Sequence, residues 1–256
     1  MTVLEMYRVL DAIAPFDSQA DFDNSGFLVG DPAREVHGVL LALDVTENVI
    51  DEALAAGAGL IITHHPLMFS PLSRLTEEDY EGRLIRRLTR ENISLIAAHT
   101  NLDQAPGGIN DALACLCGLT DVRGDGFFRM GELAESMSSG AYAAFLAERL
   151  GDTIRLMGPA DVPVRRVGLS SGGGGDEWRR AAEAGCDLFV SGEIKHHLAL
   201  AMADRGIVAC ECGHYATEYP GMAVLAEALQ NALREIECNV RVFLSEARAY
   251  GFPRKT

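Results

Sequence analysis

Short apolar runs that each end in a polar cluster recur along this chain, and they constrain its fold most strongly. Apolar runs at 60–63, 93–97 and 207–209 are each followed within a few residues by histidines and acidic residues. Segments with apolar residues at helical spacing stand between them, as at 47–56 and 109–117. Strands that alternate with helices are typical of βα units. The sequence therefore predicts an α/β fold.

The same alternation continues over the rest of the chain. Further strands are expected at 38–43, 127–133, 167–170, 188–191 and 240–244, and further helices at 3–13, 81–90, 142–150 and 223–236. The segment at 121–125 contains Gly124 and is the best candidate boundary. We expect an N-terminal lobe at 1–125 and a C-terminal lobe at 126–256. As an alternative, the last helix and strand, at about 221–256, pack back on the first lobe.

His64 and His65 close the first apolar run and precede Pro66. The residue before a proline is biased toward extended geometry, so His65 cannot begin a helix. Successive side chains on a strand point to opposite faces, so one metal ion would not easily collect both rings, whereas two ions could. For an isolated pair, one core histidine beside one exposed histidine is the more frequent arrangement.

Two further polar clusters, His99–Asp103 and Gly213–Glu218, follow the other two runs. In open α/β sheets, ligands bind outside the carboxyl ends of the strands. His214 and Glu218 are four residues apart and share one face if a helix begins there. Imidazole and carboxylate together form a ligand set that zinc, manganese, iron or nickel accepts. The alternative for this last cluster is a helix cap and a surface carboxylate.

Composition narrows the class of protein. A chain of 256 residues with 48% hydrophobic residues can bury a substantial core. The first 14 residues mix charged residues into a helical apolar pattern, unlike a signal peptide, and no long uncharged stretch would span a bilayer. The six cysteines are too few and too irregular for a secreted disulfide scaffold, so we expect reduced thiols and a cytoplasmic protein.

The net charge of −15 lies mostly in the first half of the chain. Such a field repels nucleic acid and anionic membranes, and the sequence has no basic stripe with interleaved aromatic residues. We therefore expect neither nucleic acid nor membrane as a partner. An anionic nucleotide could still bind, because bound metal ions supply local positive charge.

Three other segments allow a functional and a structural interpretation. Ser170–Gly175 could offer backbone N–H groups to an anion, but it lacks a full phosphate-loop signature, and a flexible connector is equally consistent. Glu193 and His196, three apart on a possible helix, could orient a ligand or face substrate, although a solvated helix start explains them better. Cys210 and Cys212 share a strand face, where core packing is favoured over metal ligation.

Taken in order, the motifs resemble those of the GTP cyclohydrolase I type 2 family, also known as the NGG-interacting-factor-like dinuclear metal proteins. The resemblance covers nearly the whole chain and rests on Asp23–Gly26, Leu28–Gly30, Asp44, Thr63–Phe69, His99–Asp103, Gly107–Asp111, Ser191–His197 and Gly213–Glu218. It implies two α/β lobes, each a sheet flanked by helices, around a dinuclear metal site. It also implies a toroidal homohexamer whose sites face an internal cavity.

The resemblance further implies the roles of individual residues. It assigns two divalent ions per subunit (Zn, Mn, Fe or Ni) to five ligands, with Glu218 as the bridge: His64, His65, Asp103, His214 and Glu218. By analogy His64 and His214 would hold one ion, and His65 and Asp103 the other. His99, Glu193 and His196 are then candidates for proton transfer or for orienting the ligands. The chain departs from the family pattern at Ser171–Gly173, often Gly-Ser-Gly, and at Glu193, often aspartate.

The expected function is metal-dependent hydrolysis of a nucleotide-like substrate. Two carboxylates among the ligands favour a hydrolytic over a redox ion, and they leave a positive site that attracts an anionic substrate. A metal-handling or regulatory scaffold without turnover is the alternative, and a pure interaction protein is the third hypothesis. Five ligands shared by two ions leave open coordination positions, which favours catalysis or metal exchange over a closed structural site.

Overall fold

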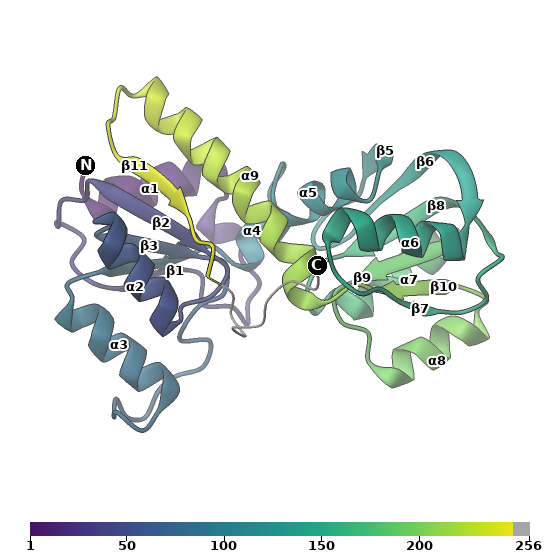
Figure 1. Ribbon diagram of the computed structural model, residues 1–256, viewed down its shortest axis with the longest axis horizontal. Coiled ribbons are helices and arrows are strands. Elements are labelled where there is room, and N and C mark those ends of the chain that lie inside the picture. The colour runs from purple at the N-terminus through teal and green to yellow at the C-terminus, as the bar shows by residue number, and fades with distance from the viewer. Residues whose placement is uncertain (248–256) are drawn as a thin grey trace. The chain divides into compact units, whose positions relative to one another are not determined.

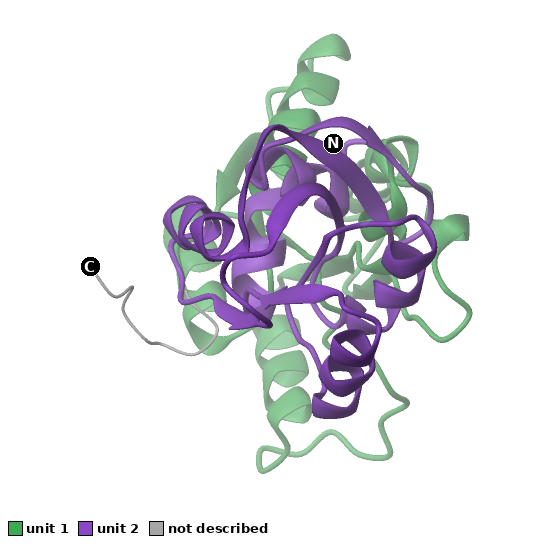
Figure 2. Ribbon diagram, turned by 90° about the vertical axis from the view of Figure 1, so that its right-hand side faces the viewer, with its two compact units in different colours: residues 1–105, 222–252 green, residues 106–221, 253–256 purple. Residues whose placement is uncertain are grey.

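The computed structural model describes residues 1–247, and these form two compact units (Figure 2). Unit 1 consists of Met1–Ala105 together with the described residues from Met222 onward. Unit 2 consists of Pro106–Gly221. Each unit contains its own β-sheet with helices packed against it. The predicted α/β class, with two sheets each flanked by helices, is therefore confirmed.

The sheet of unit 1 has five strands in the order β1-β4-β3-β2-β11, of which β1 is antiparallel to β4 and the others pair in parallel. The strands are β1 (Gly26–Val29), β2 (Gly38–Ala42), β3 (Leu60–Thr63), β4 (Ser94–Ala97) and β11 (Arg241–Leu244). Every residue of β2, β3 and β4 is buried. Burial on both faces explains why these strands are continuous apolar runs instead of alternating patterns.

The helices of unit 1 are α1 (Val3–Ile13), η1 (Phe16–Ser18), α2 (Glu47–Ala56), α3 (Tyr80–Arg90) and the short α4 (Thr100–Gln104). Helix α1 begins with a capping box in which Thr2 and Glu5 each accept the other's backbone N–H. Helices α2 and α3 lie on one face of the sheet (Figure 1). Their apolar residues pack there against alternate strand residues, including Leu40, Ile61 and Leu95.

Unit 2 contains a mixed six-stranded sheet in the order β5-β6-β8-β9-β10-β7, with β8, β9 and β10 parallel. Its strands are β5 (Leu119–Arg123), β6 (Arg129–Ser138), β7 (Arg155–Met157), β8 (Pro163–Ser170), β9 (Leu188–Ser191) and β10 (Val208–Glu211). Its helices are α5 (Ile109–Leu116), α6 (Ser139–Leu150), η2 (Gly174–Glu177), α7 (Trp178–Glu183) and α8 (His196–Asp204). One apolar cluster joins the sheet to α5 and α6, and a second joins it to α7 and α8.

The units divide at other residues than the sequence suggested. The expected boundary at 121–125 falls inside unit 2, because β5 pairs antiparallel with β6 and the glycine-bearing segment is the turn between them. Described residues from Met222 onward belong to unit 1, where β11 pairs in parallel with β2, as the alternative of a C-terminal segment packed back on the first lobe had predicted. An antiparallel turn and an interdomain linker share the same glycine and aspartate signals, so composition does not separate them.

Helix α9 (His214–Glu235) begins well before the predicted start at 223 and contains Pro220. A proline inside a helix removes one hydrogen bond, so sequence reasoning placed the helix after it. The early start matters for function, since it places His214 and Glu218 in the first two turns. No described helix is long and apolar enough to cross a membrane. All six cysteines are free.

Candidate metal centre

His64 and His65 extend β3 beyond its last assigned residue. The His64 N–H donates to the carbonyl of Ala42 at 3.2 Å, and the His65 N–H donates to Leu43 at 2.9 Å. The extended backbone thus continues along the neighbouring strand β2, as Pro66 requires of the residue before it. The two rings diverge, with centroids 5.0 Å apart and planes at 47°. The expectation that one ion would not easily collect both rings is not confirmed, because the ligand nitrogens of the two rings lie within 4.8 Å of each other.

His64 is fully buried, and one ring nitrogen has a defined partner. Its Nδ1 lies 2.9 Å from the carbonyl oxygen of Ala98. A carbonyl only accepts hydrogen bonds, so Nδ1 carries the proton and Nε2 carries the lone pair of the neutral ring. Nε2 lies 3.5 Å from Oδ1 of Asp103. An imidazole lone pair beside a carboxylate oxygen is a donor set for a divalent ion.

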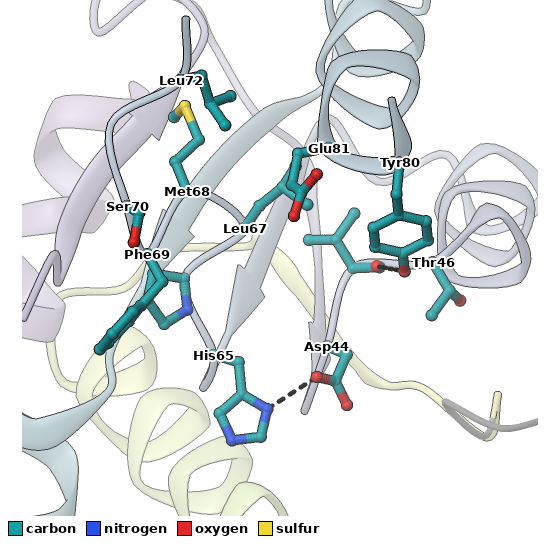
Figure 3. Close-up of a pocket in the computed structure, with 12 residues that line it drawn as sticks. Asp44, Thr46, His65, Leu67, Met68, Phe69, Ser70, Leu72, Tyr80 and Glu81 are labelled. Atoms are coloured by element: carbon teal, nitrogen blue, oxygen red, sulfur yellow. Dashed lines mark hydrogen bonds and ion pairs between the residues drawn. The ribbon is translucent and has the colours of Figure 1, made fainter. Parts of the chain in front are cut away.

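His65 is oriented by a carboxylate. Its Nδ1 lies 2.7 Å from Oδ1 of Asp44, which follows β2 (Figure 3). The carboxylate accepts the Nδ1 proton and leaves Nε2 as the ligand atom. A carboxylate behind a ligating histidine fixes its tautomer and raises its basicity. Asp44 was part of the recognised motif, but sequence reasoning gave it no role; its position at the end of a strand was the available signal.

His99 is held by a second carboxylate, Asp23. The His99 Nδ1 lies 2.8 Å from Asp23 Oδ1. The other oxygen, Oδ2, accepts the Ser25 hydroxyl at 2.8 Å and the Thr100 N–H at 3.0 Å, and it also accepts the Thr100 hydroxyl. The Asp23 side chain is fully buried. Sequence reasoning had not assigned Asp23 a role either, although it opens the first motif.

The pKa of Asp23 reflects these contacts. Burial alone would raise this pKa, because a carboxylate loses hydration in the interior. Hydrogen bonds from His99 and Thr100, together with the positive charge of a protonated His99, outweigh burial and hold the pKa of Asp23 well below its usual range. Asp23 therefore stays ionised and keeps the Nδ1 proton on His99.

Asp103 lies at the fourth position of α4, and this short helix places it beside His64. The Asp103 N–H donates to the His99 carbonyl at 3.0 Å, which closes the helical turn. Asn101, fully buried in the same turn, donates its side-chain amide to the Ala14 carbonyl at 2.8 Å. In this way α4 is anchored to the segment that follows α1.

The candidate ligand nitrogens of His64, His65 and His99 all lie within 4.8 Å of one another.

Which residues share an ion stays a prediction, but one contact bears on the pairing that the resemblance implied. The resemblance grouped His65 with Asp103, whereas the structure places the carboxylate of Asp103 beside Nε2 of His64. The contact favours His64 and Asp103 as ligands to the same ion.

Unit 2 carries a second group of ligand atoms at the start of α9. Nε2 of His214 lies 3.1 Å from Oε2 of Glu218, one turn further along the helix. Nδ1 of His214 lies 2.9 Å from Oε1 of Glu193, so this carboxylate orients the ring. Glu218 is only 4% exposed. The expected shared helix face of His214 and Glu218 is confirmed.

The glycine-rich loop after β8 packs against these ligands. The Gly172 N–H donates to the Thr217 hydroxyl at 3.0 Å, and its carbonyl accepts the Glu193 N–H at 2.8 Å. The Ser171 N–H donates to Asn110 Oδ1 at 2.8 Å. These hydrogen bonds fix the first part of the loop against the start of α9, and the anion-binding interpretation of the loop stays a prediction.

His196 has a different environment from the other candidate residues. It is exposed and forms the first residue of α8, so Glu193 lies before that helix and not three residues along it. Within residues 1–247 no hydrogen bond or ion pair is recorded for His196. The proton-transfer role considered for it stays a prediction. Glu193, in contrast, contacts the His214 ring directly.

The donor set fits divalent metal ions. Unit 1 offers imidazoles with assigned tautomers and the carboxylate of Asp103, and unit 2 offers one imidazole and the buried carboxylate of Glu218. Mixed nitrogen and oxygen donors suit zinc, manganese, iron or nickel. Among residues 1–247, the candidate metal-binding groups contain no cysteine, and burial raises the pKa of the Cys210 thiol to about 12.

Comparison with known proteins places the chain in a family. The family model of Duf34/NIF3 (NGG1p interacting factor 3) matches residues 1–249. The chain belongs to this family. A Duf34/NIF3 relative from Streptomyces coelicolor, called GTP cyclohydrolase 1 type 2 homolog, is 33% identical over 94% of this chain and 90% of its own. A relative of the same name from Clostridium acetobutylicum is 30% identical over 96% of both chains.

Solved structures of Duf34/NIF3 relatives share the architecture. The crystal structure of Staphylococcus aureus hypothetical protein SA1388 superposes with a TM-score of 0.94, at 30% identity and 99% coverage of both chains. The resemblance inferred from the motifs is thereby confirmed as family membership. The relatives' shared name refers to a cyclohydrolase.

Proposed function

We propose that this protein is a hydrolase that binds two divalent metal ions per subunit and acts on a nucleotide-like substrate. The proposed ligands are His64, His65, Asp103, His214 and Glu218. The observation that carries the proposal is that hydrogen-bonded carboxylates or carbonyls orient each of the three histidines at Nδ1. Such orientation is usual for metal-ligating imidazole, because it fixes the tautomer and leaves Nε2 as the donor atom.

Each ion would have its own histidines. His64 and Asp103 would hold one ion, His65 and His214 the other, and Glu218 would bridge the two. Two divalent ions supply Lewis acidity and lower the pKa of bound water, which is the chemistry of metal-assisted hydrolysis. The family relatives carry the name of a cyclohydrolase, which opens a ring by addition of water. That name and the donor set together support a nucleotide-like substrate.

His99 would move the proton. Asp23 accepts the Nδ1 proton of His99, so Nε2 is the atom that can take a proton from water or return it to a leaving group. The ionised Asp23 stabilises the imidazolium that forms in this step. The ring of His99 lies beside those of His64 and His65, with centroids 5.1 and 5.6 Å away. A water molecule that loses its proton near these rings would therefore have Nε2 of His99 as a nearby acceptor.

A homohexameric ring in the cytoplasm completes the proposal. The resemblance implied this assembly, and the composition agrees with it, since 7% aromatic residues and many small ones suit broad flat contacts. Closed symmetric rings are a common outcome for homo-oligomers. Both the assembly and the cellular location stay predictions.

Elemental analysis followed by a substrate panel tests the function. The protein would be purified without added metal, analysed, reloaded with zinc or manganese, and incubated with purine nucleotides and phosphoesters. We expect about two ions per subunit, and hydrolysis that a chelator abolishes. Fewer than about one ion per subunit after reloading would contradict the site. Full metal loading without turnover on any substrate would contradict the hydrolase.

A metal-handling scaffold is the second candidate, because two ligand rings are accessible to solvent. The side chains of His65 and His214 are 23% and 30% exposed. Accessible ligands allow ions to exchange with an acceptor. Stoichiometric transfer of zinc from the loaded protein to a metal-free acceptor, with no hydrolysis of the panel, would favour this function over the hydrolase.

A further inference from the structure

A cavity of about 410 Å³ lies beside His65, entirely within unit 1 (Figure 3). Its walls come from the residues after β2, from the segment that follows His65, and from the start of α3. A volume of this size suits a small organic ligand or one ring system of a larger ligand. Its lining includes the aromatic side chains of Phe69 and Tyr80 and the carboxylates of Asp44 and Glu81.

Two aromatic rings line the cavity and stay half exposed. Phe69 is 51% exposed and Tyr80 is 49% exposed. The Tyr80 hydroxyl donates to the Val45 carbonyl at 3.0 Å, which holds its ring in place. Phe69 packs edge-on against the His99 ring, with centroids 6.0 Å apart and planes at 84°. Held aromatic rings on a cavity wall favour flat ligands, because stacking then costs little side-chain entropy.

The charges on the wall select against anions. The cavity is lined by residues of the described chain, and they include Asp44 and Glu81 but no arginine or lysine. A phosphate placed there would meet two carboxylates and no counter-charge. The lining therefore favours a neutral or cationic group, and the anionic part of a nucleotide-like molecule belongs outside this cavity.

Glu81 is the group that lacks a protein partner at this wall. Asp44 already accepts a proton from His65, whereas Glu81 forms no hydrogen bond or ion pair with any residue in 1–247. Glu81 lines the cavity together with its neighbour Tyr80 at the start of α3, as Figure 3 shows. A ligand that displaces water from this carboxylate must return hydrogen-bond donors to it.

We propose that this cavity binds a planar nitrogen heterocycle that stacks on Phe69 or Tyr80 and presents two adjacent N–H donors to Glu81. An amidine-like edge of this kind matches both oxygens of a carboxylate. His65 forms part of the same wall, so the bound ring lies next to one proposed metal ligand. As a part of the substrate site the cavity rests on the proposed function, but its binding preference requires neither metal nor turnover.

Two fused-ring probes separate stacking from hydrogen bonding. 2-Aminobenzimidazole carries adjacent N–H donors, and 1-methylbenzimidazole has the same ring system without an N–H. Affinities would be measured by titration calorimetry or ligand-observed NMR on chelator-treated full-length protein. We expect 2-aminobenzimidazole to bind about tenfold more tightly or better, as for other two-point contacts with a ring edge. Glu81→Gln should abolish most of this preference, and Phe69→Leu should weaken both probes.

A matched control and separate readouts make the outcomes decisive. Glu78→Gln removes an exposed carboxylate from the same segment outside the cavity and should change neither affinity. The inference would be overturned if the two probes bound equally or if neither bound. It would also be overturned if Glu81→Gln and Phe69→Leu both left the affinities unchanged. A retained probe preference in protein that neither holds metal nor hydrolyses any substrate would contradict only the proposed function. Thermal unfolding would establish that each variant is folded.

Discussion

A Cβ atom on Gly172 would overlap Oε1 of Glu218, and it would lie 3.1 Å from Nε2 of His214. Gly172 also has φ +49, in the left-handed region. Two independent constraints therefore favour glycine at this position: the left-handed backbone, and the contact between the loop after β8 and the first two turns of α9. The loop therefore packs directly against the Glu218 carboxylate and leaves room for it only because residue 172 has no side chain.

Gly172→Ala should therefore lower metal binding. The methyl group displaces the Glu218 carboxylate, and the left-handed backbone adds about 1–2 kcal/mol of strain. Elemental analysis should show loss of the ions that Glu218 holds, and urea unfolding should show the loss of stability. Gly173→Ala is the control, because its Cβ meets nothing within 4 Å and its φ is −77. Equal metal content in the two variants would contradict this role of Gly172.

Substitution of the two carboxylate ligands should give different metal contents. Glu218→Gln should lower the occupancy of both ions if its carboxylate bridges them, as proposed. Asp103→Asn should chiefly lose the ion shared with His64, because Asp103 lies beside that ring. Glu227→Gln, on the exposed face of α9, is the control. Elemental analysis of the three variants after reloading checks this, and an equal loss in both ligand variants would argue against a bridging Glu218.

His99→Ala should keep its metal and lose most of its turnover. Removal of a general acid or base typically costs about 100-fold or more. Activity on the responsive substrate and metal content would be measured on the same preparation. If metal content fell to the same extent as activity, the result would indicate that His99 is a metal ligand and not a proton-transfer group. Unchanged turnover in fully metallated protein would remove His99 from the mechanism.

The contribution of Asp23 to folding stability should depend on pH. Its pKa is depressed in the folded protein, so its contribution is fully present above the unfolded value of about 3.9 and is lost as the pH falls toward the folded value. At pH 7, Asp23→Asn should lower the free energy of unfolding by on the order of 2 kcal/mol, and the difference should shrink below about pH 4. Urea unfolding at several pH values measures this.

Asp21→Asn serves as the control for that series. Asp21 is an exposed neighbour, so its substitution should leave the free energy of unfolding nearly unchanged at every pH. A difference between Asp23→Asn and the parent that stays constant from pH 7 to pH 3 would mean that the ionised carboxylate is not the source of the stability.

The subunits should form a closed oligomer. Light scattering at several micromolar concentrations should give a mass near six times the 27.6 kDa chain, independent of concentration. A mass near that of the single chain over the same range would exclude the homohexamer and leave the metal centre to be explained in a monomer.

The sequence by itself determined the class of fold and the chemical nature of the site. Buried parallel strands must be apolar along their whole length, and polar residues can follow only where the strand leaves the sheet, so the positions of His64, His65 and Asp103 were visible in the pattern. The spacing of His214 and Glu218 likewise required only that a helix begin there.

Only the tertiary structure decided how those residues are oriented and which of them share a partner. The contacts of Asp23 with His99 and of Asp44 with His65 join positions 76 and 21 residues apart, and no local pattern encodes them. The same holds for Gly172: a side chain there would overlap Glu218, which lies on another element. Periodicity is set by the nearest neighbours along the chain, whereas these relationships depend on the packing of elements that are distant in sequence.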